Sequence, residues 1–138
     1  MTTRLNPYLS FRDTTRQAME FYRSVFGGEL AMNTFGEFHA SQDPSEQDKI
    51  MHAMLTAPNG FVLMAADTPN SMEFKPGNGY AISLSGDDGA AIGGWWDKLS
   101  AGGTVTMPLA KQIWGDMFGM CTDKFGVSWM VNIAGSGP

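Results

Sequence analysis

Residues 54–64 read MLTAPNGFVLM, and residues 120–130 read MCTDKFGVSWM. The two stretches align at a constant offset of 66, with methionine, threonine, glycine and methionine at matching places. Upstream, residues 27–32 (GGELAM) align with residues 102–107 (GGTVTM) at an offset of 75, so one extra loop lies in the first half, around the polar run 38–49. The sequence therefore predicts an internal duplication, and two copied units that face each other would share a cleft.

Each half contains the same order of predicted elements. Apolar periodicity and turn residues in the first half predict a strand at 6–12, a helix at 15–26, and strands at 29–35, 50–56 and 61–66. In the second half they predict a strand at 80–85, a helix from 87 to 99, and strands at 104–109, 114–122 and 127–133. We expect an α+β fold of two βαβββ modules, at about 4–66 and about 79–133, joined by a linker at about 67–78.

Helix ends carry their own signals. Thr14 and Gln17 have the spacing of a capping box before the first helix. A glycine pair follows each helix, at 27–28 and at 102–103. In the second helix, Gly93 and Gly94 lower the intrinsic helix propensity, so the aromatic side chains are expected to hold this helix on the sheet.

Composition excludes several classes of protein. The chain has 138 residues, of which 43% are hydrophobic and 17% charged, and its formal net charge is −5. Lysine and arginine do not cluster, which argues against a nucleic-acid partner, and no apolar run approaches the ~18–20 residues of a membrane span. We expect a cytoplasmic protein whose single cysteine, Cys121, is a small buried strand residue, the alternative being a reactive thiol.

Three parts of the chain resemble the vicinal-oxygen-chelate superfamily of glyoxalases, bleomycin-resistance proteins and extradiol dioxygenases, and within it the PhnB-like branch. They are residues 7–11 (PYLSF) with 18–28 (AMEFYRSVFGG), residues 51–55 (MHAML), and residues 114–132 (WGDMFGMCTDKFGVSWMVN). The resemblance implies the glyoxalase/bleomycin-resistance fold, in which two modules form a concave mixed sheet. It also implies a homodimer, with modules of two chains sometimes completing each cleft. It does not imply a particular activity.

The resemblance further implies where a divalent metal would be held. Superfamily enzymes take ligands from the first strand of each module, usually His or Gln, and from the last strand, four residues past the turn glycine, usually Glu. In this chain the corresponding positions are Asn6, Met64, Gly79 and Met130. Magnesium and manganese favour oxygen ligands, and zinc, iron and nickel favour imidazole, carboxylate or thiolate. We therefore expect no metal and no cofactor at this place.

Apolar side chains stand where ligands are expected. The chain has 11 methionines, and four of them fall at duplicated positions: Met54, Met64, Met120 and Met130. Methionine is unbranched and polarisable, and it adapts to varied shapes. One interpretation is a soft pocket for a hydrophobic or aromatic ligand, with Tyr8, Trp114 and Phe118 near its mouth. The other is that methionine simply fills a small cleft between two sheets.

Polar candidates are fewer. His52 lies on the same predicted strand face as Met54, either as a base or hydrogen-bond donor or as a structural histidine. His39 is expected to be solvated in the polar loop. Asp116 either contacts a polar ligand group or serves a turn, and Arg12 either lines the mouth or is solvated. The run from Asp123 to Gly126 is expected to be a hairpin turn without a catalytic acid.

The adjacent Trp95 and Trp96 point to different faces of the second helix. One is expected to pack on the sheet and the other to lie at a subunit contact. We predict a homodimeric, metal-free protein that binds a largely apolar small molecule. The alternative is a lyase or isomerase that uses His52 as a base, with or without a weakly bound divalent metal. A structural role with an empty cleft is the third hypothesis, and no glycine-rich nucleotide motif supports a methyltransferase.

Overall fold

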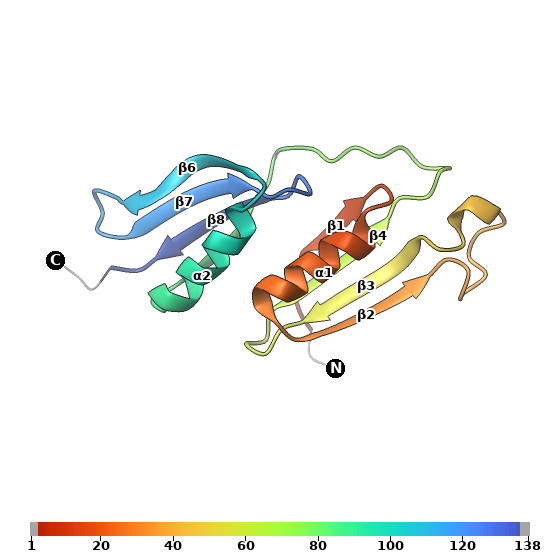
Figure 1. The fold of residues 1–138 in the computed structure, drawn as a ribbon, viewed down its shortest axis with the longest axis horizontal. Helices are drawn as coiled ribbons and strands as arrows, with labels where there is room; N and C mark the ends of the chain where they lie inside the picture. The colour runs from red at the N-terminus through yellow and green to blue at the C-terminus, as the bar shows by residue number, and fades with distance from the viewer. Residues whose placement is uncertain (1–2, 136–138) are drawn as a thin grey trace. The chain divides into compact units, whose positions relative to one another are not determined.

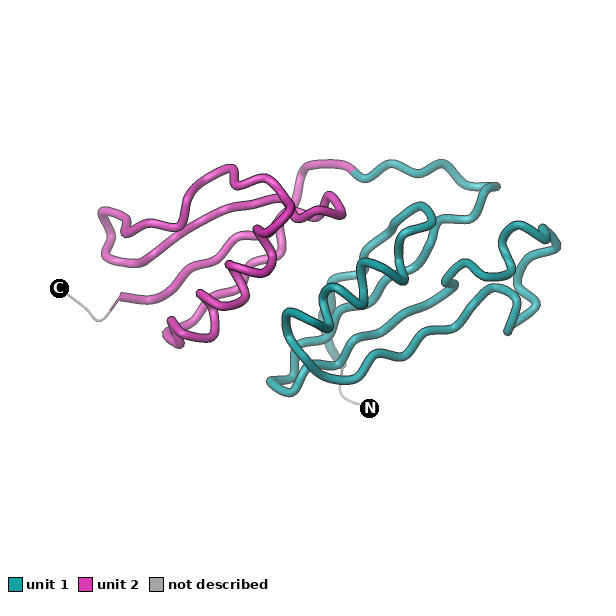
Figure 2. The backbone as a smooth tube through the Cα atoms, in the orientation of Figure 1, with its two compact units in different colours: residues 1–76 teal, residues 77–138 magenta. Residues whose placement is uncertain are grey.

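The computed structural model describes residues 3–135, and the chain divides into two compact units, residues 1–76 and residues 77–138 (Figure 2). Each unit contains one four-stranded mixed sheet with one α-helix across one of its faces (Figure 1). The predicted α+β fold of two βαβββ modules is confirmed, with one separate sheet in each module. Among the described residues, no helix is both long and apolar enough to cross a membrane.

Both units use the same strand order. Unit 1 consists of β1 (Tyr8–Phe11), α1 (Thr15–Phe26), β2 (Glu29–Thr34), the short 3-10 helix η1 (Pro44–Glu46), β3 (Ile50–Thr56) and β4 (Val62–Asp67). Unit 2 consists of β5 (Ile82–Gly86), α2 (Gly89–Ser100), β6 (Thr104–Lys111), β7 (Met117–Thr122) and β8 (Ser128–Ile133). The sheets run β1-β4-β3-β2 and β5-β8-β7-β6, and in each the first strand is parallel to the last while the other neighbours are antiparallel.

The strand register confirms the duplication seen in the sequence. Met54 pairs with Met64 across β3 and β4, and Met120 pairs with Met130 across β7 and β8. The four methionines thus occupy the same places in the two sheets. Because a slip of one residue would turn every side chain to the other face, this agreement fixes which face each residue occupies.

The core of each unit lies between its helix and its sheet. Along α1 the buried side chains recur at helical spacing. Residues 53–56 of β3 and 63–67 of β4 alternate between buried and more exposed, because successive strand residues point to opposite faces. In unit 1 the buried residues include Leu9, Met19, Tyr22, Ala53, Leu55 and Ala65. In unit 2 they include Leu84, Ile92, Leu99, Trp129 and Val131. The opposite face of each sheet is therefore free of its own helix.

Trp96 is the aromatic anchor of α2. It is buried, and a Cβ placed on Gly119 of β7 would lie 2.9 Å from the far edge of its indole ring. Glycine at position 119 thus makes room for the ring against the sheet. Trp95 is half-buried. The expectation that one of the two tryptophans packs on the sheet is confirmed for Trp96.

Gly93 and Gly94 weaken α2, although no neighbouring atom among the described residues requires glycine at either position. A Cβ at either position would meet no atom within 4 Å. Glycine is less favourable than alanine inside a helix by about 1 kcal/mol. We expect Gly93→Ala and Gly94→Ala each to raise the free energy of unfolding by about 0.5–1 kcal/mol, measured by urea denaturation. A loss of stability would show that another surface packs against the bare backbone.

The second glycine of each helix-ending pair sits against the backbone of the sheet. A Cβ on Gly28 would overlap the carbonyl oxygen of Thr56, and a Cβ on Gly103 would overlap that of Thr122. The first glycines have φ angles of 76° and 78° at positions 27 and 102, in the left-handed region that ends a helix. In both units, therefore, the first glycine ends the helix and the second allows the chain to lie close to the sheet backbone.

The predicted capping box at α1 is wrong. Thr14 is the N-cap residue, but its side chain makes no capping hydrogen bond. Instead the buried carboxylate of Asp67, at the end of β4, accepts hydrogen bonds from the backbone N–H of Thr15 at 3.0 Å and of Ile50 at 2.8 Å. A long-range carboxylate thus replaces the local partner because β4 ends beside the start of α1 and satisfies one of its free N–H groups. At α2 the cap is local, since the side chain of Asp88 accepts a hydrogen bond from the N–H of Ala91 at 3.0 Å.

Three predicted strands start two or three residues too early. Residues 6–7, 80–81 and 114–116 lie outside β1, β5 and β7. The last difference has a clear cause, since a tight turn closes there: the N–H of Gly115 donates to the carbonyl of Gln112, and the N–H of Gln112 donates to the carbonyl of Asp116. Trp114 is therefore a turn residue.

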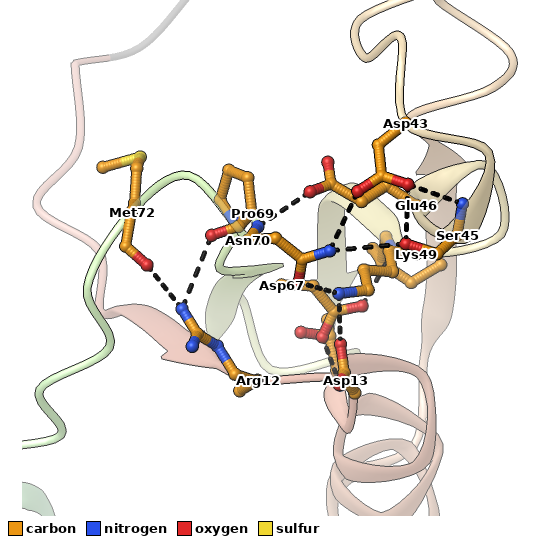
Figure 3. Close-up of polar contacts among 12 residues, drawn as sticks. Arg12, Asp13, Asp43, Ser45, Glu46, Lys49, Asp67, Pro69, Asn70 and Met72 are labelled. Atoms are coloured by element: carbon orange, nitrogen blue, oxygen red, sulfur yellow. Dashed lines mark hydrogen bonds and ion pairs between the residues drawn. The ribbon is translucent and has the colours of Figure 1, made fainter.

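A polar network fixes the loop 36–49 of unit 1 (Figure 3). The Nζ of Lys49 lies 2.8 Å from the carboxylate of Asp13 and donates to the side-chain oxygen of Asn70 at 2.9 Å. The backbone N–H of Asn70 donates to the buried Glu46 at 2.7 Å. The polar run predicted as a loop is thus a loop that Lys49 and Glu46 tie to the rest of unit 1.

Candidate functional site

The candidate site is the sheet face turned away from a unit's own helix, which we call the open face. In unit 1, Tyr8 pairs with Met64, Met64 with Met54, and Met54 with Ala31, so one row of residues crosses all four strands. Directly paired residues point to the same face, and the chain neighbours of this row on β1, β3 and β4 are buried on the helix side. Met54 is 37% exposed and Tyr8 53%. The row is therefore an accessible, uncharged surface.

Unit 2 carries the equivalent row. Ser83 pairs with Met130, Met130 with Met120, and Met120 with Met107. Cys121, the chain neighbour of Met120, is buried on the helix side, so the row again lies on the open face. Three adjacent strands thus present three methionines side by side.

Sequence-predicted ligand-binding residues gather in two groups. Tyr8, Met54 and Met64 lie together on the open face of unit 1. Phe118, Met120 and Met130 lie together on the open face of unit 2. Trp114, in the turn before β7, makes an edge-on contact with Phe118, with 6.1 Å between ring centroids, and is 59% exposed. Each group combines thioethers with at least one aromatic ring.

His52 belongs to the first group. It is paired with Asn33 of β2, and its position two residues before Met54 puts it on the same face of β3. Its ring centroid lies 6.2 Å from that of Tyr8, and the side chain is half-buried. His39, by contrast, is an exposed loop residue in the left-handed conformation. Of the two histidines, His52 is the one on the open face.

The positions at which relatives are expected to hold a metal provide few ligand atoms. Asn6 precedes β1, and Gly79 precedes β5. Tyr8 pairs with Met64 and Ser83 pairs with Met130, so Tyr8 and Ser83 occupy equivalent places in the two sheets. Asn6 and Ala81 each lie two residues earlier. Ala81, instead of Gly79, is therefore the counterpart of Asn6. Alanine offers no ligand atom either. Within residues 3–135, no group of three or more His, Cys, Asp or Glu side chains is placed to hold a metal ion.

Asp116 holds the Trp114 turn to the end of the chain's last strand. Its carboxylate accepts hydrogen bonds from the side-chain amide of Asn132 at 2.9 Å and from the N–H of Gly135 at 2.8 Å. The bond from Asn132 and, to a smaller extent, the bond from Gly135 lower the pKa of Asp116 below its ordinary value. The structure thus gives Asp116 a role in holding the turn.

Arg12 is held by the segment that follows β4 (Figure 3). Its guanidinium donates to the backbone carbonyls of Met72 and Pro69 and lies 5.9 Å from the ring centre of Phe74. Arg12 thus anchors the first part of the predicted linker to unit 1.

Cys121 is a buried strand residue. Burial, together with the nearby Asp123, raises the pKa of its thiol from 9.0 to about 11. The nucleophilic thiolate is therefore scarce at neutral pH, and the side chain is shielded. We expect iodoacetamide at pH 8 to leave Cys121 unmodified in the folded protein and to alkylate it fully in urea, as read by intact mass. Fast alkylation without denaturant would contradict this.

Met107 and Ser83 are site residues that sequence reasoning missed. A fixed-offset alignment places Met107 opposite Met32, but Met32 pairs with the buried Ala53, on the helix side of its sheet. A local change of register on β6 turns Met107 to the other face. The change of register leaves no gap in the sequence alignment, so only the strand pairing shows it.

Comparison with known proteins shows the family. The family model of the Glyoxalase/Bleomycin resistance protein/Dioxygenase superfamily matches residues 4–131. The chain belongs to this superfamily. It is 29% identical over 145 residues to protein YjdN of Escherichia coli K12, a match that covers 97% of each sequence. The resemblance noted in the sequence is thereby confirmed.

Two solved structures agree with the fold. Protein PA1353 from Pseudomonas aeruginosa is 39% identical, with a TM-score of 0.84 over 98% of this chain and 100% of its own. A PhnB protein from Bacillus cereus is 25% identical, with a TM-score of 0.74 over 96% of this chain and 100% of its own. The chain is thus similar to a PhnB protein over nearly its whole length.

Proposed function

We propose that this superfamily member is a small-molecule-binding protein that holds a largely apolar ligand on its methionine-lined open faces without a divalent metal. The observation that carries the proposal is the pairing of Met54 with Met64 and of Met120 with Met130 at equivalent places in the two sheets. Thioether side chains are poor partners for the divalent ions of the superfamily's enzymes, but they contact apolar and aromatic molecules well.

Flanking residues support a ligand of mixed character. Tyr8 and Phe118 place aromatic rings beside the methionines, while Ser83, His52 and Asn33 offer hydrogen-bonding groups on the same faces. Sites that bind small molecules are commonly apolar with a few polar groups that fix orientation. We therefore propose an uncharged ligand with an apolar body and one or two polar substituents.

A fluorescence titration with N-phenyl-1-naphthylamine, an uncharged apolar probe, tests the proposal. We expect saturable binding to the wild-type protein. A charge beside an apolar ligand must be desolvated, so Met54→Glu and Met120→Glu are expected to weaken binding about tenfold or more. Met72→Glu is the matched control, because Met72 is 60% exposed and lies outside both sheets. Unchanged affinity in both open-face variants would contradict the proposal.

The alternative function is a lyase or isomerase that uses His52 as a base, with or without a weakly bound divalent metal. The place of His52 beside Tyr8, on the same open face as the methionine row, favours it. Turnover of a ligand identified by binding would be compared for His52→Ala and for the control His39→Ala. Loss of turnover in His52→Ala alone would support catalysis, and full turnover would exclude this role for His52.

We also propose that the protein is a homodimer. The support is the resemblance to dimeric relatives and the half-buried Trp95 on α2. Light scattering after size-exclusion chromatography would give the mass directly. We expect twice the 15.0 kDa of one chain, and a mass of one chain at micromolar concentration would contradict the dimer.

A further inference from the structure

A β-bulge on β6 decides which side chains reach the open face of unit 2. Val105 pairs with Cys121, but the next pair along is Met107 with Met120, so Thr106 is an extra residue on β6. Bulges of this kind re-aim side chains and are found beside functional sites. Here the bulge brings Met107 into line with Met120.

Unit 1 shows what the sheet is like without the bulge. There Ala31 pairs with Met54, and Met32 pairs with Ala53 one step further on, without a shift. The methionine that aligns with Met107 in sequence therefore lies on the helix side. The duplicated units differ at this point, and only unit 2 has a third methionine in its open-face row.

The three methionines of unit 2 are close enough to share one bound atom. Direct partners on antiparallel strands have Cα atoms about 4.5–5.5 Å apart, and each methionine has three rotatable bonds along its chain. Met120 lies in the middle strand, with Met107 and Met130 on either side. Met107 is 41% exposed, so the row is open to solvent. All three sulfur atoms can therefore turn towards one point above Met120.

Thioether sulfur is a soft ligand and selects Cu⁺ over the harder divalent ions. We propose that Met107, Met120 and Met130 form a binding site for a soft monovalent cation of the Cu⁺ class. No redox step is involved, because the cation binds and leaves in the same oxidation state. The inference goes beyond the proposed function, since it concerns an inorganic ion and depends on the sulfur atoms themselves.

Anaerobic titration with Cu⁺, in competition with the chromophoric chelator bicinchoninate, tests the site. We expect the folded wild-type protein to withdraw one equivalent of Cu⁺ per chain. Replacing a methionine with leucine conserves volume and hydrophobicity but removes the ligand atom. Met107→Leu, Met120→Leu and Met130→Leu are each expected to lower the Cu⁺ affinity about tenfold or more.

Two matched controls separate this site from other sulfur atoms. Met32→Leu changes the sequence counterpart of Met107 on the helix side of unit 1 and should leave Cu⁺ binding unchanged. Cys121→Ala removes the buried thiol and should also leave it unchanged. Loss of binding in Cys121→Ala, or equal binding in wild type and the triple leucine variant, would overturn the proposal.

The same variants distinguish the two proposals. Leucine keeps the surface apolar, so the triple leucine variant is expected to bind N-phenyl-1-naphthylamine as the wild type does while it loses Cu⁺. Failure of the wild-type protein to bind the probe, with Cu⁺ bound by the wild type and lost in the triple leucine variant, would overturn the proposed function alone. Retention of both would overturn only the cation site.

Discussion

Gly28→Ala is expected to destabilise the protein by more than about 4 kcal/mol, enough to prevent folding of unit 1. The added Cβ would overlap the carbonyl oxygen of Thr56 and lie 2.7 Å from the Cα of Ala57, and backbone atoms in a sheet cannot move away cheaply. The φ angle of Gly28, 100°, adds further strain for any L side chain. Circular dichroism and the urea midpoint would measure the loss.

Two other glycines would show whether steric overlap or backbone conformation causes most of the loss of stability. At Gly103 the same substitution would overlap the carbonyl oxygen of Thr122, so we expect a loss of similar size in unit 2. At Gly60 the φ angle is 89°, but a Cβ would meet nothing within 4 Å, so Gly60→Ala should cost only about 1–2 kcal/mol. Equal effects at positions 28 and 60 would show that backbone conformation, instead of the close approach, decides the cost.

Asp123→Ala is expected to lower the free energy of unfolding by about 3–5 kcal/mol. The carboxylate is buried at 3% exposure and accepts three hydrogen bonds. One oxygen accepts from the N–H groups of Phe125 at 2.8 Å and Val127 at 3.1 Å, and the other accepts from the indole N–H of Trp129 at 2.8 Å. Alanine would leave all three donors without this partner. Chemical denaturation would give the difference.

Asparagine at the same position gives a graded control. Asp123→Asn keeps one oxygen for the two backbone donors but turns an NH₂ group towards the indole N–H of Trp129, so we expect a smaller loss than with alanine. Asp97→Ala changes an exposed aspartate on α2 and should stay within about 0.5 kcal/mol. An alanine effect at position 123 no larger than that at 97 would contradict the role of the buried carboxylate.

Much of the fold could be predicted because the signals are local or repeated. The glycine pairs ended both helices as expected, and the methionines matched by the repeat occupy equivalent places in the two sheets. Asp88 caps α2 through the N–H of Ala91, only three residues further along the chain. Each of these features depends on neighbours in sequence or on a copied register.

Long-range contacts could not be predicted in the same way. The cap of α1 comes from Asp67, a distant residue that meets Thr15 only after β4 has joined the sheet. The turn that contains Trp114 shortens β7 through backbone hydrogen bonds that apolar periodicity does not register. Likewise the bulge at Thr106 depends on how β6 pairs with β7. The alignment therefore contained Met107 but did not show that its side chain lies on the open face.

The central claim is that the methionine-lined open faces bind an apolar ligand without a divalent metal. The most direct measurement is the Kd of N-phenyl-1-naphthylamine for protein treated with a strong chelator, compared with the same protein after addition of Zn²⁺, Ni²⁺, Fe²⁺ or Mn²⁺. We predict the same Kd in every case. Binding that disappears in chelator and returns with one equivalent of a divalent ion would contradict the claim.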